Sequence, residues 1–316
     1  MTERRISLKN VLIILNPRAG MRQANRRFAE IIDIFCRAGY QVSVVTTGKS
    51  GDGREFAKTR AKGNDLIVCI GGDGTFNEVA SGLLESGYDV PIGYIPAGST
   101  NDFASSLGLS KDIIHGAKDI ATGVPITLDM GKFNDRFFSY VASFGAFTRT
   151  SYSVPQDMKN LLGHTAYILE GIKDIPSIKP LKLRITNEQG IYGGEYIFGA
   201  ICNSTSMGGI ITLDKDYVDM NDGLFEVILI RSPKNIIELT QITWALTQNK
   251  YMDCPHISFF SSSNLEIEAD ENMPWTLDGE YQRGFRNITV SNLKSAIKIM
   301  VSGHHISAEK ANKEKI

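Results

Sequence analysis

The chain contains few cysteines, and no two of them have the spacing of a metal-binding or redox motif. Cys36, Cys69, Cys202 and Cys254 are the 4 cysteines among 316 residues, and they are widely separated. Small disulfide-stapled scaffolds and zinc ribbons are therefore excluded, because both need closely spaced cysteines. We expect these residues to be reduced thiols in a cytoplasmic protein.

Clusters of positive charge and long apolar runs are also missing. The formal net charge is −1, and no stretch is rich in lysine and arginine, so we expect no nucleic-acid partner. The longest apolar runs have the length of strands, so we expect no transmembrane helix and no signal peptide near Met1. The residues are 42% hydrophobic and 22% charged, as in ordinary globular proteins, and the length predicts about two domains.

A glycine-rich motif, Gly-Gly-Asp-Gly-Thr at residues 71–75, follows an apolar run at residues 66–70. The run predicts a buried parallel strand, and residues 76–84 predict the next helix. Such a turn points backbone N–H groups at an anion beside a helix N-terminus, and glycine permits positive φ and close approach. We therefore predict a phosphate-binding turn with Asp73 at its tip. A dinucleotide fingerprint does not fit, because Asn77 stands where its third glycine would be.

Two further strand–loop–helix units carry polar loops that contain glycine. The loop at residues 16–20 follows an apolar strand at residues 11–15, and the loop at residues 96–104 follows an apolar run at residues 90–95. Residues 99–102 are all of types that cap helices, so a capped helix alone would explain the last loop. Three strand ends of one parallel sheet nevertheless meet at the edge where open α/β sheets bind ligands. We expect the three loops to form one site.

Strands and helices alternate as far as about residue 125, which predicts a doubly wound parallel α/β sheet in residues 1–126. The pattern then changes to hairpin-connected strands, and residues 265–269 alternate apolar and acidic side chains. We predict an antiparallel β-sandwich domain at residues 127–294 with helical insertions at residues 154–173 and 233–248. The strands expected in it are residues 137–147, 181–187, 191–202, 225–231, 256–260, 265–269 and 288–290.

The ordered set of loops resembles a known family. Asn-Pro-x-(Ala/Ser)-Gly, Gly-Gly-Asp-Gly-Thr-x-Asn-Glu and Pro-x-Gly-(Ser/Thr)-x-Asn-Asp-Phe-Ala, with Leu-Asp-Gly-Glu at residues 277–280, are typical of the soluble bacterial diacylglycerol kinases and related lipid kinases. Sphingosine and ceramide kinases share this catalytic domain. One departure is Ser99, where many relatives have threonine. The resemblance covers most of the chain and implies an NAD-kinase-like first domain, to which residues from about 295 to 316 return.

The resemblance implies an ATP- and Mg²⁺-dependent kinase that phosphorylates a lipid hydroxyl, with diacylglycerol as the first expectation and phosphatidic acid as its product. The partner is then a lipid at the cytoplasmic face of the membrane, which the protein visits peripherally. Ceramide-like, undecaprenol-like and glycolipid acceptors stay open, as does a homodimer. Phosphoryl transfer depends on positioning, on charge neutralisation by a metal and on one carboxylate base.

The resemblance implies two catalytic carboxylates. The family's proton acceptor matches Glu280, which would otherwise be interpreted as part of a polar turn. Asp73 is the candidate carboxylate on the metal or substrate side of the phosphate-binding turn. Asp129 matches a family acid at the domain junction, and the alternative is a solvated carboxylate at the end of a strand.

The nucleotide is expected to bind to the three loops and to a threonine just past the second strand. These residues are Asn16, Pro17, Arg18, Ala19, Gly20, Thr47, Gly71, Gly72, Asp73, Gly74, Thr75, Phe76, Asn77, Ser99, Thr100, Asn101 and Asp102.

An acidic segment at residues 214–224 is the candidate site for a structural Mg²⁺ ion. It does not fit an EF-hand loop, because Val218 stands at its fifth position. The resemblance implies a ligand from the side chain of Asp222 and backbone oxygens from Asp219 and Leu224, a set of hard oxygen donors that suits magnesium. A solvated acidic turn is the alternative.

Two other functions stay open. An NAD-kinase-like soluble phosphotransferase would share the glycine-rich turn, but residues 278–280 and Asp222 argue against it. A regulator that binds nucleotide or lipid without catalysis is the second alternative, and the filled polar positions of the motifs argue against it. The apolar stripe of residues 154–173 is interpreted as core, a lipid-pocket cover or a membrane contact.

Overall fold

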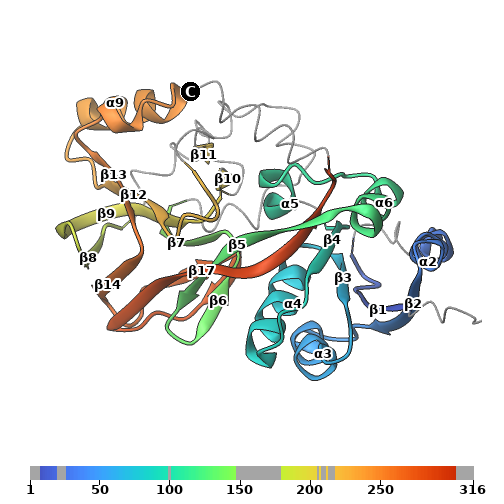
Figure 1. Cartoon of the computed structure of the whole chain (residues 1–316). Helices are drawn as coiled ribbons and strands as arrows, with labels where there is room; N and C mark the ends of the chain where they lie inside the picture. Colours follow the sequence, from blue (N-terminus) through green and yellow to red (C-terminus); the bar gives the residue numbers. More distant parts are fainter. Residues whose placement is uncertain are drawn as a thin grey trace, which may run out of the picture. The chain divides into compact units, whose positions relative to one another are not determined.

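The structure is a computed structural model of the whole chain (Figure 1). It describes residues 8–19, 26–98, 101–146, 179–204, 206–207, 211–212 and 218–303. The chain divides into two compact units, Met1–Leu128 with Ala296–Ile316, and Asp129–Ser295. The predicted helix at residues 154–173 lies outside the described residues, as do residues 214–217 of the acidic segment.

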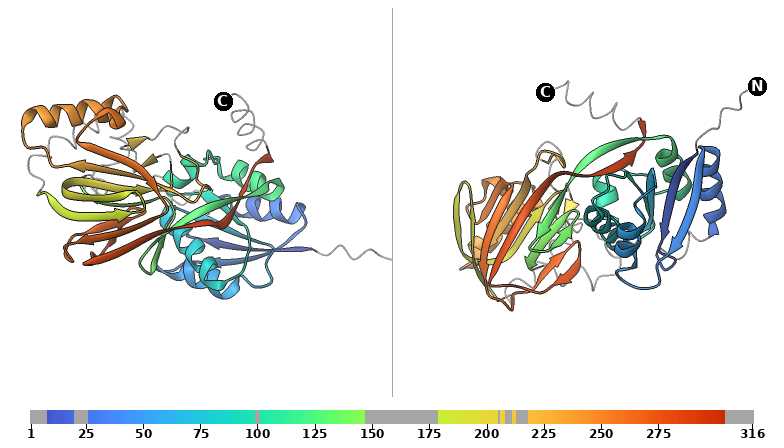
Figure 2. Two further views of the ribbon diagram at one scale, coloured as in Figure 1. Left: turned by 60° about the vertical axis from the view of Figure 1, so that its left-hand side comes forward. Right: turned by 60° about the horizontal axis from the view of Figure 1, so that its bottom comes forward.

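The first unit is a parallel sheet with the strand order β17–β4–β3–β1–β2. Its strands are β1 (Lys9–Leu15), β2 (Tyr40–Thr46), β3 (Leu66–Gly71), β4 (Ile92–Pro96) and the end of β17 (Asn287–Val301). Its helices include α2 (Phe28–Arg37), α3 (Asp52–Arg60), α4 (Asp73–Ser86), α5 (Asp102–Ser106) and α6 (Ile113–Thr122). Helix α3 packs with α4, and α2 packs with α6 on the other face of the sheet (Figure 2). The doubly wound fold is confirmed.

The central strand β3 is buried along its whole length. Strands with helices on both faces are expected to be continuously apolar, which explains the unbroken run at residues 66–70. Val68 belongs to the cluster that also contains Ile31 and Phe35 of α2. The opposite face of the sheet is covered by α4, where Phe76 and Val79 are fully buried.

The strand register places the predicted loops at one edge of the sheet. Leu15 pairs with Ile70 and with Thr46, and Ile70 pairs with Ile95. The residues that follow these strand positions therefore leave the sheet at the same level. Figure 1 shows β1, β3 and β4 side by side in this unit.

The second unit is antiparallel, with the strand order β16–β15–β7–β9–β8–β14–β17 and with β12 between β9 and β13. Its elements include β6 (Arg136–Phe138), β7 (Val141–Gly145), β8 (Leu181–Asn187), β9 (Gly190–Cys202), β10 (Ser206–Met207), β11 (Ile211–Thr212), β12 (Phe225–Arg231), α9 (Ile236–Thr247), a 3₁₀ turn (Tyr251–Asp253), β13 (Ile257–Ser262), β14 (Asn264–Ala269), β15 (Trp275–Leu277) and β16 (Glu280–Gln282). Strands β5 (Val124–Phe133) and β17 carry the chain between the units. The predicted antiparallel domain is confirmed.

The structure corrects two strand predictions. The strand expected at residues 137–147 is interrupted, because the N–H groups of Ser139, Tyr140 and Val141 donate to the carboxylate of Asp278 between β6 and β7. The strand expected at residues 288–290 is only a part of β17, which spans 15 residues. Strand β5 was not predicted.

Candidate functional site

The two glycine-rich loops of the first unit touch each other through Gly72 and Gly98. A Cβ atom on Gly98 would lie 2.6 Å from the Cα atom of Gly72, and one on Gly72 would lie 3.2 Å from the Cα atom of Gly98. The expectation of positive φ in the first loop is wrong: Gly72 has φ −90° and ψ −177°, and neither Gly71 nor Gly74 has positive φ. Close backbone approach is the reason for glycine at this contact.

Asp73 connects the same two loops. It lies in the first turn of α4, so the helix begins three residues earlier than predicted and the expected turn residues 73–75 are helical. The backbone N–H of Asp102 donates to Asp73 Oδ2 at 3.0 Å, and the Tyr94 hydroxyl donates to Oδ1 at 3.3 Å. A carboxylate in the first turn is also stabilised by the partial positive charge of the helix N-terminus.

The first loop joins this arrangement through Asn16. Asn16 Nδ2 donates to Thr75 Oγ1 at 3.0 Å, and Asn16 Oδ1 accepts the backbone N–H of Arg18 at 3.0 Å. Thr75 in turn covers Gly71, where a Cβ atom would lie 2.6 Å from the Cβ atom of Thr75. The structure therefore brings the described parts of all three predicted loops together.

Asn101 holds its own loop rather than capping the next helix. Its backbone has φ 53°, in the left-handed region, and its side chain makes no capping hydrogen bond to α5. Instead, Oδ1 accepts the N–H of Gly98 and Nδ2 donates to the Gly98 carbonyl, both at 2.9 Å. The first N–H group of α5, that of Asp102, is bound instead by the carboxylate of Asp73, which belongs to the other glycine-rich loop.

The remaining predicted nucleotide residues differ in what they offer a ligand. Phe76 is fully buried and stacks on Phe103 at 4.4 Å, and its N–H donates to the Gly72 carbonyl, so it supports α4 from the core. Thr47 is half-buried and donates its N–H to the Leu15 carbonyl at 2.9 Å. Pro17, Ala19 and Asn77 are half-buried as well. Gly20, Ser99 and Thr100 lie outside the described residues.

In the second unit, Asp278 and Gly279 form the two-residue turn between β15 and β16. Their φ angles of 50° and 81° are those of a type I′ hairpin turn, for which Asp-Gly is a favoured pair. Asp278 is buried, and its carboxylate accepts the N–H groups of Ser139 at 2.6 Å, Tyr140 at 2.9 Å and Val141 at 3.1 Å. This aspartate therefore ties the hairpin to β7.

Glu280 is the first residue of β16, with 53% of its side chain exposed. Its Oε2 atom is 2.6 Å from Nη2 of Arg136. Arg136 Nη1 also donates to the carbonyl of Tyr281 at 3.2 Å and to Oε1 of Gln282 at 3.1 Å. The predicted base is thus a solvent-accessible carboxylate whose orientation is set by one arginine.

Asp129 organises the acidic loop. Its Oδ2 accepts the N–H of Gly223 and its Oδ1 accepts the N–H of Ser295, both at 2.7 Å. Asp129 is fully buried, so the alternative of a solvated carboxylate is wrong. Within the loop, the N–H of Leu224 donates to Asp222 Oδ1 at 2.8 Å.

Several carboxyl groups lie close together around this loop. Burial raises the pKa of Asp222, and the neighbouring Asp219 and Asp129 raise it further. Burial, together with Asp222, raises the pKa of Glu226 to about 8. The described part of the chain contains no group of three His, Cys, Asp or Glu side chains arranged to hold a metal, so a cation here would need backbone oxygens as well.

Comparison with known proteins agrees with this geometry. The model of the diacylglycerol kinase catalytic domain matches residues 10–133, and the model of the YegS C-terminal NAD kinase beta sandwich-like domain matches residues 141–301. A diacylglycerol kinase of Bacillus subtilis (strain 168) is 33% identical over 276 residues, which are 87% of this chain and 90% of that protein. The chain belongs to the diacylglycerol kinase family.

Other members of the family extend the match. A diacylglycerol kinase of Staphylococcus aureus (strain MRSA252) is 29% identical, over 98% of this chain and 97% of its own length. A crystal structure of a diacylglycerol kinase from Bacillus anthracis str. Sterne has 22% identity and a TM-score of 0.76, and the match covers 94% of this chain and 99% of that one. This structural likeness shows the shared fold.

Two polar residues of this diacylglycerol kinase family member were not assigned a role from the sequence. Glu78, within the predicted motif, accepts the N–H groups of Gly51 at 2.7 Å and Gly53 at 3.0 Å, and thereby caps α3. Arg136 pairs with Glu280 across 144 positions in the chain. The motif could have pointed to Glu78, whereas no local signal marks Arg136.

Proposed function

We propose that this chain transfers the γ-phosphoryl group of ATP to the hydroxyl of diacylglycerol, which gives phosphatidic acid and ADP. The observation that carries the proposal is the contact between Gly72 and Gly98 at the carboxyl ends of β3 and β4. At this contact the two loop backbones pack directly on each other, and this holds the loop after β4 beside the N-terminus of α4, where a helix favours a phosphate group. Membership of a family of ATP-dependent lipid kinases supports the same reaction.

The phosphates of ATP are proposed to bind at the first turn of α4 and at the loops that follow β1 and β4. The amide groups of a first helical turn have no partner inside the helix and attract anions. Asn16 and Asp73 hold the neighbouring loops in position through Thr75 and Asp102. Preorganised donors of this kind lower the barrier because phosphoryl transfer depends on positioning and charge neutralisation.

Glu280 is proposed to accept the proton of the lipid hydroxyl. Its carboxylate is accessible, and the hydrogen bonds of Arg136 to Glu280, Tyr281 and Gln282 hold it on β16. Asp73 is proposed to act on the metal–nucleotide side of the reaction, in addition to its hydrogen bond with the Asp102 N–H. The two carboxylates therefore have separable roles.

A structural Mg²⁺ ion fits the acidic loop. Asp222 would supply a side-chain oxygen, and Asp219 and Leu224 would supply backbone oxygens. The pKa values of Asp222 and Glu226 are raised mainly by burial and further by neighbouring carboxyl groups, and a bound cation would stabilise the ionised form of these groups. When bound, the ion would hold the acidic loop that precedes β12. Asp129 connects the same loop to β17 through the N–H groups of Gly223 and Ser295.

A lipid panel assay tests the proposal. The purified chain is incubated with γ-labelled ATP and either NAD or mixed micelles that contain diacylglycerol, a ceramide, undecaprenol or a glycolipid. The products are separated by thin-layer chromatography, and ATP binding is measured by calorimetry. We expect labelled phosphatidic acid. Phosphorylation of NAD in place of any lipid would support the soluble phosphotransferase, and ATP binding without a product would support the non-catalytic regulator.

A further inference from the structure

Helix α9 (Ile236–Thr247) has apolar side chains on both its inner and its outer face. On the inner face, Ile242 and Leu246 are buried against the second unit. On the outer face, Ile236, Ile237 and Trp244 are 72%, 67% and 52% exposed. A helix that is apolar on all sides is normally buried, so the outer face of α9 indicates a contact with something other than the described chain.

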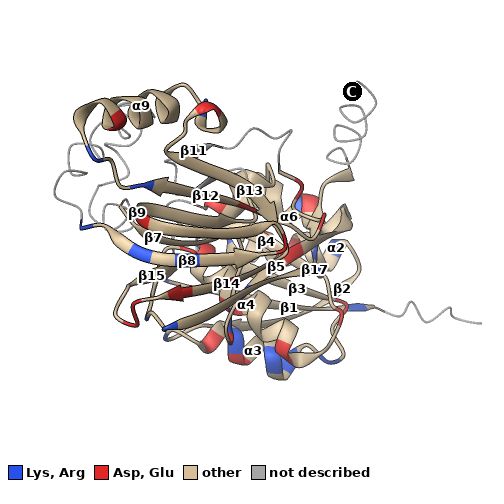
Figure 3. Ribbon diagram, turned by 90° about the vertical axis from the view of Figure 1, so that its left-hand side faces the viewer, with Lys and Arg blue, Asp and Glu red and all other residues tan. Residues whose placement is uncertain are grey.

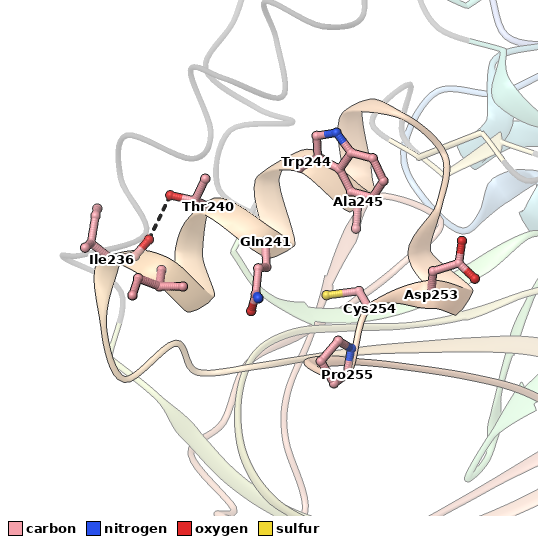
Figure 4. A pocket seen from close by; sticks show the side chains of 9 residues that line it. Ile236, Thr240, Gln241, Trp244, Ala245, Asp253, Cys254 and Pro255 are labelled. Atoms are coloured by element: carbon pink, nitrogen blue, oxygen red, sulfur yellow. Dashed lines mark hydrogen bonds between the residues drawn. The ribbon is translucent and has the colours of Figure 1, made fainter.

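The surface beside this face is hollowed. A pocket of about 520 Å³ lies between α9 and the segment at residues 253–255, and Ile236, Trp244 and Cys254 are among the residues that line it (Figure 4). Met252, next to this segment, is 50% exposed. The apolar surface therefore continues beyond the helix.

The charges around α9 nearly cancel. Lys234 and Lys250 flank the helix, while Glu238 and Asp253 are the acidic residues in the same stretch. Glu238 accepts the N–H of Lys234 at 2.8 Å and so belongs to the helix start. Figure 3 shows the α9 ribbon almost without charged residues. A binding partner is thus expected to be recognised mainly by apolar contact.

Trp244 and Lys250 form a pair that suits a water–hydrocarbon boundary. The Nζ atom of Lys250 lies 5.4 Å from the centre of the Trp244 ring. Both side chains combine an apolar body with a polar end, and such residues are enriched where a protein meets the headgroup region of a bilayer.

We propose that the outer face of α9 docks on the surface of a lipid bilayer, with Ile236, Ile237 and Trp244 entering the headgroup–acyl boundary. The choice of a bilayer as the occupant rests on the proposed function, because diacylglycerol resides in membranes. None of the described helices is long and apolar enough to cross a membrane, so α9 supplies a peripheral contact. Because its charges nearly cancel, docking depends little on anionic lipid.

Tryptophan fluorescence tests the contact without any kinase assay. The chain has 2 tryptophans; Trp244 is exposed, whereas Trp275 is 1% exposed in the core. We expect vesicles of phosphatidylcholine to shift the emission to the blue, and brominated phosphatidylcholine to quench it. Trp244→Phe should abolish both changes. Emission that does not respond to vesicles would overturn the proposal.

Vesicle sedimentation of the full chain gives the second readout. The double variant Ile236→Ser/Ile237→Ser should bind phosphatidylcholine vesicles about tenfold more weakly, since binding of such helices scales with buried apolar area. Ile191→Ser is the matched control, because Ile191 is 58% exposed on β9 and should not affect binding. Adding phosphatidylglycerol to the vesicles should change the binding of the parent chain and of the double variant little.

The competing occupants give different results. A concentration-dependent dimer that the double variant abolishes would assign the face to a second copy of the chain. Quenching by a short-chain brominated lipid below its aggregation limit would assign the pocket to a single lipid molecule. Either result overturns bilayer docking. Failure of the proposed function would instead appear as vesicle binding without phosphorylation of short-chain diacylglycerol by the parent chain.

Discussion

The backbone N–H of Asp102 donates to Oδ2 of Asp73 at 3.0 Å, so the carboxylate of one glycine-rich loop holds the start of the helix that follows the other. The Tyr94 hydroxyl supports the same carboxylate from β4. A residue assigned to the chemistry from its motif therefore also has a structural role, and substitutions at Asp73 must separate the two.

The variants Asp73→Asn and Asp73→Ala separate the chemical role of Asp73 from its structural role. Asparagine keeps an oxygen for the Asp102 N–H and a group that can bond the Tyr94 hydroxyl, but it loses the negative charge. We expect both variants to lose turnover and magnesium-dependent ATP binding. Alanine should in addition lower the free energy of unfolding by about 1–3 kcal/mol, because it leaves the Asp102 N–H without its acceptor.

Steady-state kinetics, calorimetry with Mg–ATP and urea denaturation measure these effects. Near-normal turnover in Asp73→Asn, with a defect only in Asp73→Ala, would show that the residue is purely structural.

The contact between Gly72 and Gly98 predicts a local loss of nucleotide binding. In Gly98→Ala the new Cβ atom would lie 2.6 Å from the Cα atom of Gly72 and 2.8 Å from Oδ1 of Asn101. The loops must separate, and we expect ATP affinity to fall by about tenfold or more, since the bound geometry tolerates little displacement. Isothermal calorimetry on the folded variant measures the change.

Gly116→Ala is the matched control in the same unit. Its Cβ atom would meet only the Ser110 carbonyl oxygen, at 3.7 Å, and alanine favours a helix such as α6. ATP affinity should be unchanged. Equal affinity in the parent and in Gly98→Ala would place the nucleotide elsewhere.

The first unit could be predicted closely because its signals are local. The apolar run at residues 66–70 is buried as expected, and parallel register alone brings the loops after β1, β3 and β4 to one edge. The helix was predicted to begin at residue 76, but α4 begins at Asp73. The glycines of the motif suggested a turn at residues that are in fact helical. The hydrogen bond from Asn16 to Thr75 also follows, because the parallel register brings their two loops together.

The second unit was less predictable, because its decisive contacts join distant parts of the chain. The interruption near Tyr140 depends on Asp278, and these two residues are 138 positions apart. Arg136 looks like an ordinary strand residue until the fold places it beside Glu280. Asp129 was expected as an acid at the domain junction, with a solvated carboxylate as the alternative. Its burial was not foreseen, because the two N–H groups that bind its carboxylate come from segments distant in the sequence.

The acidic loop predicts a magnesium-dependent stability. If Asp222 holds a structural ion, magnesium should raise the melting temperature of the parent chain, since an ion that binds only the folded state stabilises it by mass action. Asp222→Ala should melt at a lower temperature in magnesium and should lose this shift. Differential scanning calorimetry with magnesium and with EDTA measures both effects.

Asp135→Ala is the control, because Asp135 is an exposed acid in the turn between β5 and β6. It should keep the full magnesium shift. Identical shifts in the parent and in Asp222→Ala would mean that the loop is an acidic turn without a structural ion.

Glu280→Gln tests the proposed base. Glutamine has nearly the same volume and can accept a hydrogen bond from Arg136, but it cannot take a proton from the lipid hydroxyl. General-base assistance contributes about a hundred- to ten-thousand-fold in rate, so kcat on diacylglycerol should fall by that factor. ATP affinity, which depends on the loops of the first unit, should change little. Glu268→Gln is the control, because Glu268 is an exposed glutamate on β14 of the same unit, and it should keep parental kcat. Near-normal turnover in Glu280→Gln would transfer the base to Asp73, the assignment expected of an NAD-kinase-like enzyme.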